Sequence, residues 1–182
     1  MREAMQPGAR DMPYYEWTET MSVGVALFDS DHKALIGLID RLHDSAEREE
    51  PAPLDEIFDR LIAYTELHFA REEKGMEACG YPEIEIHRDQ HAGFTDRIYR
   101  ARERYRGGAD PALTRELLEY LKLWLNHHIL IQDMAYKPYV EHNWWAREVS
   151  RVFGPGLADE ATADPPHNAS IHCLEVISPL RN

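Results

Sequence analysis

Apolar side chains recur every three or four residues in four long stretches of this sequence, and prolines and glycines separate the stretches. That spacing places apolar residues on one face of an α-helix. We expect the helices at about 30–50, 53–80, 83–105 and 110–139. Four long amphipathic helices joined by short breaks pack most simply as an all-α, up-down-up-down four-helix bundle.

The ends and inward faces of these helices can be predicted from local signals. Asp29 is a good N-cap for the first helix, and Gly80 is a typical residue to end the second. The inward residues expected are His32, Leu35, Ile36, Ile39, Leu42 and His43 in the first helix, Leu54, Ile57, Leu61, Tyr64, His68 and Met76 in the second, Ile84, His87, His91, Phe94 and Ile98 in the third, and Leu113, Leu117, Leu121, Trp124, Leu125, His128 and Ile131 in the fourth.

Outside the periodic stretches the chain is expected to be irregular. Residues 1–20 contain prolines and an aromatic cluster, Tyr14, Tyr15 and Trp17, which is typical of an extended arm that packs on a core. We therefore predict an N-terminal arm at 1–20, the bundle at 21–148 and an irregular C-terminal extension at 149–182.

Charge and hydropathy exclude several classes of partner. The 182 residues carry a formal net charge of −13, which repels phosphate backbones and anionic lipid heads. The longest apolar run, 23–28, is far shorter than the roughly 18 residues that a membrane span requires. We expect no nucleic-acid partner, no membrane insertion and a cytoplasmic location. Cys79 and Cys173 are too few to predict a disulfide framework or a thiolate metal site.

Each predicted helix carries a histidine on its apolar face. A single such histidine is most simply a hydrogen-bonded core residue. His68 and Glu72 are four residues apart, as are His87 and His91, so each pair projects two donor atoms from one helical face. Ten histidines in 182 positions produce about 0.5 His-x-x-x-His pairs by chance, so one pair alone is weak evidence.

The full set of candidate ligands is more specific than any one pair. Antiparallel helices could bring these residues to one level of a bundle. The set comprises His32, His68, Glu72, His87, His91, His128 and Asp133. Five imidazoles and two carboxylates are too many for one tetrahedral zinc ion, whereas two metals bridged by carboxylates use them all. Mixed imidazole and carboxylate donors suit iron better than magnesium or calcium.

Four segments that contain these residues resemble the motif set of the hemerythrin family, in its bacterial single-domain form. They are Asp29-Ser-Asp-His32-Lys, His68-Phe-Ala-Arg-Glu72-Glu, His87-x-x-x-His91 and Trp124-Leu-Asn-His-His128-Ile-Leu-Ile-Gln-Asp133. The resemblance covers about 17–139, and all seven ligand positions hold the expected residue types. The arm and the tail have no counterpart in this motif set.

The resemblance implies a di-iron, oxygen-bridged centre. It assigns His87, His91 and His128 to one iron, His32 and His68 to the other, and Glu72 and Asp133 to both. Dioxygen would bind at the two-histidine iron. The residues implied around the gas are apolar: Leu35, Phe69, Trp124, Leu125 and Ile129. They are also expected core residues of any bundle.

The function that the resemblance implies is reversible dioxygen binding for storage, delivery or sensing, without enzymatic activity. Neutral imidazole donors favour this role, because bundle oxygenases use more carboxylates to stabilise high-valent iron. Two alternatives stay open. One is a di-iron peroxidase or oxidase that uses the same ligands. The other is an oxygen-sensing module that acts through an unidentified protein partner.

The spacing of His128 and Asp133 poses a geometric problem. At 100° per residue, five residues separate their side chains by about 140° on a regular α-helix. A π-bulge would bring both to one face, and Pro138 already weakens the helix nearby. Alternatively, the helix stays regular and Asp133 reaches the metals from the flank.

Overall fold

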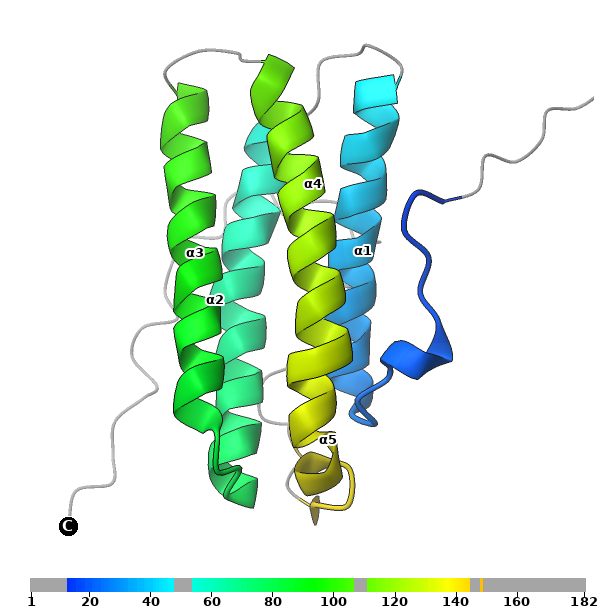
Figure 1. Ribbon diagram of the computed structural model, residues 1–182, viewed down its shortest axis with the longest axis vertical. Coiled ribbons are helices and arrows are strands. Elements are labelled where there is room, and N and C mark those ends of the chain that lie inside the picture. Colours follow the sequence, from blue (N-terminus) through cyan, green and yellow to red (C-terminus); the bar gives the residue numbers. More distant parts are fainter. Residues whose placement is uncertain (1–12, 48–53, 107–110, 145–147, 149–182) are drawn as a thin grey trace, which may run out of the picture.

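Four long helices form an antiparallel bundle (Figure 1). The computed structural model describes residues 13–47, 54–106, 111–144 and 148, and these residues contain no strand. The long helices are α1 (Ala26–Glu47), α2 (Leu54–Cys79), α3 (Ile84–Arg106) and α4 (Pro111–His127). Helix α2 packs on α1 and α3, and α4 closes the bundle against α1 and α3. The expected all-α, up-down-up-down bundle is confirmed.

The fourth helix does not end at His127. It continues as a π-helical turn, η2 (His128–Asp133), and then as α5 (Met134–Val140), which contains Pro138. One extra residue in a turn rotates the positions that follow it relative to a regular α-helix. Ile131, which we expected inside, is accordingly 55% exposed. That expectation was wrong because it assumed an unbroken α-helical period.

The start of the first helix also differs from the prediction. Helix α1 begins at Ala26, so Asp29 lies in its first turn instead of capping it. Its carboxylate accepts hydrogen bonds from the Val23 backbone N–H at 2.9 Å and from the Ser22 hydroxyl at 2.6 Å. Asp29 therefore ties the preceding loop, which includes Gly24 at φ 79°, to the helix N-terminus.

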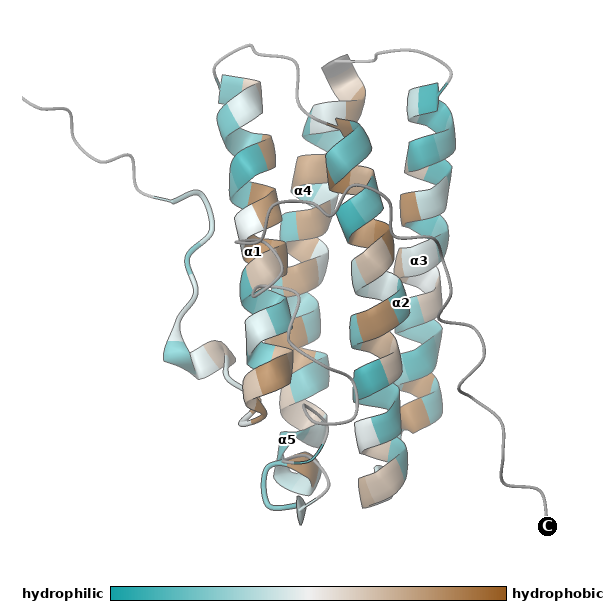
Figure 2. Cartoon of the chain, turned by 180° about the vertical axis from the view of Figure 1, so that it is seen from behind, coloured by the Kyte–Doolittle hydropathy of each residue, from teal (hydrophilic) through white to brown (hydrophobic). Residues whose placement is uncertain are grey.

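The described residues form two apolar clusters inside the bundle, and buried polar residues separate the clusters along the helices. The larger cluster includes Leu35, Phe69 and Leu125, and the smaller includes Phe28 and Met76. In α1 the buried polar residues lie between Phe28 and Leu35. In α2 they lie between Tyr64 and Met76. Figure 2 shows apolar and polar residues alternating around each helix, as the predicted periodicity requires.

The described part of the N-terminal arm lies beside α1 (Figure 1). Tyr14 stacks on His43 with ring centroids 4.1 Å apart. The Tyr15 N–H donates to Asp40 at 2.9 Å, and Lys122 of α4 donates to the Tyr14 carbonyl at 3.1 Å. Aromatic packing of the arm is thus present in 13–17, and a short 3-10 helix, η1 (Glu19–Met21), follows. Residues 1–12 and the predicted extension at 149–182 lie outside the described residues.

The described helices give no indication of a membrane span. None of them combines the length and the apolarity that crossing a bilayer requires.

Gly80 ends α2 in a left-handed backbone conformation, as its position at the end of the helix predicts. A substitution at Gly80 tests how much this conformation contributes to stability. Its φ is 70°, and Tyr81 N–H donates to the Met76 carbonyl at 3.0 Å. A Cβ there meets nothing within 4 Å, so only backbone strain opposes Gly80→Ala. We expect a loss of ~1 kcal/mol in the free energy of unfolding, measured by urea denaturation.

Gly93 is a matched control within α3. A Cβ there also meets nothing within 4 Å, but its backbone is helical. Gly93→Ala should stabilise the protein by roughly 0.5–1 kcal/mol. Equal effects of the two substitutions would refute the assignment of the Gly80 effect to backbone strain.

Candidate metal centre

Among the described residues, ten polar or charged side chains are almost fully buried in the interior of the bundle. They are Asp31, His32, Thr65, His68, Arg71, Glu72, His87, His91, His128 and Asp133. All seven candidate ligands are in this set, and each of the seven is at most 2% exposed. Burying so many polar groups is unfavourable unless they have partners, so their mutual geometry decides what the cluster can do.

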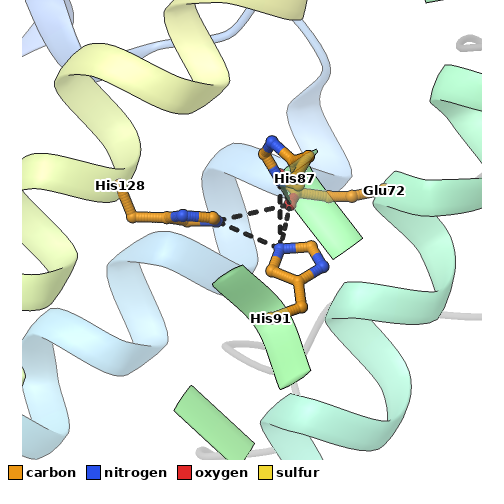
Figure 3. Close-up of side chains that lie close together, drawn as sticks. All are labelled: Glu72, His87, His91 and His128. Atoms are coloured by element: carbon orange, nitrogen blue, oxygen red, sulfur yellow. Dashed lines mark hydrogen bonds and ion pairs between the residues drawn. The ribbon is translucent and has the colours of Figure 1, made fainter. Parts of the chain in front are cut away.

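Glu72 lies at the centre of the cluster. Its Oε2 is 3.5 Å from His87 Nε2, 3.3 Å from His91 Nε2 and 3.9 Å from His128 Nε2. Figure 3 shows these four side chains, from α2, α3 and the start of η2, pointing toward one another. The three imidazole nitrogens also crowd together, with His91 Nε2 3.1 Å from both His87 Nε2 and His128 Nε2.

The second oxygen of Glu72 faces the other two histidines. Oε1 lies 3.4 Å from His68 Nε2 and 3.7 Å from His32 Nε2. Glu72 therefore divides the imidazoles into a group of three and a group of two, with one carboxylate oxygen toward each group. Both groups, each with Glu72, satisfy the geometry of a site that could hold a metal ion.

Asp133 divides the imidazoles in the same way from the opposite side. Its Oδ1 is 3.3 Å from His128 Nε2 and 3.6 Å from His87 Nε2, whereas Oδ2 is 3.3 Å from His32 Nε2. Two carboxylates thus each present one oxygen to each group. That is the arrangement that two bridging carboxylates require.

Five of the atoms that face the centre lack hydrogen-bond partners among the described residues. These atoms are Nε2 of His32 and His68, Oε2 of Glu72 and both carboxylate oxygens of Asp133. A buried polar atom without a partner costs about 1–3 kcal/mol. Nitrogen and oxygen lone pairs directed at a common space fit two divalent cations well, because each cation would satisfy several of them.

The electrostatics of the protein without metal reflect this crowding. Burial opposes ionisation of Glu72, but His68 and the other imidazoles outweigh it and hold the Glu72 pKa well below its usual value. Burial likewise opposes protonation of His68, yet Glu72 and Asp31 raise its pKa to about 10. For His128, burial dominates and lowers the pKa. The two carboxylates beside His68 therefore favour positive charge on that imidazole, whereas burial disfavours it on His128.

The π-helical turn resolves the geometric problem of the five-residue spacing. η2 begins at His128 and ends at Asp133, and the two side chains approach to 3.3 Å. Of the two alternatives that the sequence left open, the π-bulge is therefore the observed one. The added residue is what brings both donors to the inner face of the helix.

The residues expected around the gas all belong to the larger apolar cluster or pack against it. Leu35, Leu125 and Ile129 are at most 1% exposed, and Phe69 is 3% exposed. Trp124 is partly buried. Its ring stacks on His128 at 4.2 Å, and the Phe69 ring stacks on His91 at 3.7 Å. Apolar rings therefore cover two of the three imidazoles in the larger group.

Sequence reasoning missed several residues that contact the cluster. The buried Tyr136 hydroxyl donates a short hydrogen bond to Glu72 Oε1, and Tyr64 stacks on His68 at 4.5 Å. Asp31 and Glu73 hydrogen-bond to candidate ligands from outside the cluster. Tyr136 follows Asp133 by three residues, which was the available signal. His127, the neighbour of His128 in the sequence, is exposed and lies outside the cluster.

The bundle and its buried histidine–carboxylate cluster define a metal-binding protein of the four-helix-bundle class. The family model described as hemerythrin HHE cation binding domain matches residues 23–140. Proteins similar in sequence and solved structures similar in fold agree with this match. The chain belongs to the hemerythrin family.

Proteins similar in sequence carry hemerythrin names. The chain is 32% identical over 155 residues to a bacteriohemerythrin of Pseudomonas aeruginosa, which covers 79% of this chain and 100% of that protein. It is 30% identical over 123 residues to a myohemerythrin of Theromyzon tessulatum, which covers 68% and 91%. A crystal structure of a hemerythrin point mutant superposes with a TM-score of 0.59 at 25% identity, over 71% of this chain and 99% of that one.

The raised pKa of His68 predicts alkaline sensitivity of the metal-free protein. Unfolded, the imidazole loses its proton near pH 6.5; folded, it holds the proton to about pH 10. The stabilisation is therefore complete below the unfolded pKa and is lost as pH rises toward the folded one. We expect the free energy of unfolding of chelator-treated protein to fall by a few kcal/mol over that range, measured by urea denaturation.

The metal-loaded protein is the control for this prediction. A cation on His68 Nε2 replaces the proton, so the decline should be much smaller after metal is restored. A chelator-treated protein with constant stability over the same range would show that His68 is not held protonated by its carboxylate neighbours.

Proposed function

We propose that the protein binds dioxygen reversibly at a di-iron centre and that it is a carrier, store or sensor of the gas. The observation that carries this proposal is the division of seven buried donors into groups of three and two imidazoles by two shared carboxylates. We assign His87, His91 and His128 to one iron, His32 and His68 to the other, and Glu72 and Asp133 to both.

The unequal donor groups support a specific position for the gas. An iron pair held there would supply two electrons and one open coordination position, which is the chemistry that reversible dioxygen binding needs. The group of two imidazoles supplies one donor fewer, so the open position falls in the half of His32 and His68. Both side chains are fully buried, which keeps bulk water from that half.

The charge of the donor set supports carriage over oxidation. Five of the seven donors are imidazoles and only Glu72 and Asp133 carry negative charge. Anionic donors stabilise high-valent iron, and bundle oxygenases use more of them. The apolar residues Leu35, Leu125 and Ile129 add no acid or base to the interior. We propose that the functional unit is the bundle at 21–148, with the arm at 1–20 and the extension at 149–182 outside it.

The proposal is tested by the visible spectrum of the anaerobically reduced protein. Admitting oxygen should produce a charge-transfer band, and flushing with argon should remove it over repeated cycles. Irreversible conversion to the fully oxidised spectrum at the first exposure would instead support the oxidase alternative.

The ligand assignment predicts the metal content of matched variants. Purified wild-type protein should contain about two irons per chain, because seven convergent donors exceed what one ion uses. Glu72→Ala should lower the content strongly, since Glu72 faces both groups, whereas His127→Ala should not, since His127 is exposed. Iron is measured by a colorimetric or mass-spectrometric assay. Equal iron in the two variants would contradict the assignment.

Leu125 is predicted to exclude water from the bound gas. It is fully buried and lies three residues before His128, one turn earlier on the same face. Leu125→Ala should speed autoxidation, followed as decay of the oxygenated spectrum, without changing the iron content.

Leu121→Ala is the matched control, because Leu121 is equally buried one further turn from His128. Both truncations should destabilise the bundle by about 2–5 kcal/mol. If the two variants autoxidise equally fast, general loosening of the core explains the effect and Leu125 has no place in the gas pocket.

A further inference from the structure

The five clustered histidines differ in the hydrogen bonds of their outer nitrogens, the Nδ1 atoms, which face away from the centre of the cluster. His68 Nδ1 is 3.2 Å from the Asp31 carboxylate, and His91 Nδ1 is 2.9 Å from the Glu73 carboxylate. By contrast, Nδ1 of His32, His87 and His128 has no hydrogen-bond partner among the described residues. One histidine in each group is therefore fixed from behind by an acidic side chain.

An arginine holds each of these two carboxylates. Arg71 donates to Asp31 at 2.9 Å, and both side chains are almost fully buried. Arg88 Nε lies 3.5 Å from Glu73 Oε2, with both side chains about 30% exposed (31% and 27%). The same motif of arginine, carboxylate and imidazole thus occurs once in the sealed interior and once at the surface between α2 and α3.

The hydrogen bond decides which way each ring presents its lone pair. A carboxylate accepts the Nδ1–H, so the lone pair is left on Nε2, the atom that faces Glu72 in both rings. Carboxylate support also makes the imidazole a stronger donor. The described residues place no such constraint on the outer nitrogen of the three other imidazoles.

We propose that Asp31 and Glu73 are positioning residues, each held by its arginine, that orient one histidine in each half of the metal centre. This inference rests on the proposed two-metal centre and adds to it the residues that set the affinity of each half. Asp31 acts on the half of His32 and His68, and Glu73 acts on the half that contains His91.

Glu73 is the better target for a test, because its removal does not bury an uncompensated charge. Arg88 keeps ion pairs with Glu77 at 2.9 Å and Glu85 at 2.6 Å when Glu73 is replaced. Replacing Asp31 instead breaks an ion pair whose two side chains are both almost fully buried, and such a loss strongly destabilises a fold. Asp31→Asn is therefore a supporting variant and not the decisive one.

The experiment is a titration of the metal-free full-length chain with Co²⁺, followed by absorption. Wild-type protein should bind two ions. In Glu73→Ala the affinity for one Co²⁺ ion should fall ten- to a hundredfold, while the affinity for the second ion stays unchanged. Glu73→Gln retains an acceptor oxygen and should recover most of the lost affinity. Glu66→Ala, on the same groove of α2 and α3, is the control and should match wild type.

Two further readouts separate positioning from a structural role. The thermal stability of the metal-free Glu73→Ala chain should fall only slightly below that of wild type, because Glu73 is partly exposed and Arg88 keeps other partners. The substitution should add no loss of affinity when His91 is already alanine. If Glu73→Ala binds both ions as wild type does, or weakens both equally, the inference is overturned. A wild-type chain that binds fewer than two ions would contradict the proposed function itself and remove this inference with it.

Discussion

The burial of two carboxylates inside a helical bundle is the interaction on which the rest of this structure depends. Glu72 and Asp133 are fully buried, and an isolated buried carboxylate is strongly unfavourable. Five imidazoles surround them, so that protons or cations can compensate their charge. Apolar packing on either side and the π-helical turn η2 hold these groups at one level.

The helices meet this requirement through register. Each of α1, α2 and α3 places its donors between residues of the two apolar clusters, so that apolar packing above and below fixes their height. The last helix needs the π-helical turn, because a regular helix would direct His128 and Asp133 to different faces. The π-helical hydrogen bonding of η2, which departs from the regular α-helical pattern, is therefore part of the site.

Much of this arrangement could be predicted from sequence, because it depends on local spacing. The helical period predicted the four helices, and the four-residue spacings within 68–72 and 87–91 indicated convergent donors. Contacts between helices could not be predicted in the same way. The bond from Tyr136 to Glu72 and the pairing of Arg88 with Glu73 join residues far apart in sequence, and they depend on the rotation of packed helices. Ile131 was misplaced for a related reason, since one added residue shifts the period.

The central claim is that one bundle holds two irons in unequal donor sets. Three imidazoles face one set of carboxylate oxygens and two face the other, so the two irons must have different surroundings once oxygen binds. Mössbauer spectroscopy of isotopically enriched, oxygenated protein measures this directly. The structure predicts two quadrupole doublets of equal area. A single doublet, or areas in any other ratio, would contradict a pair of inequivalent irons.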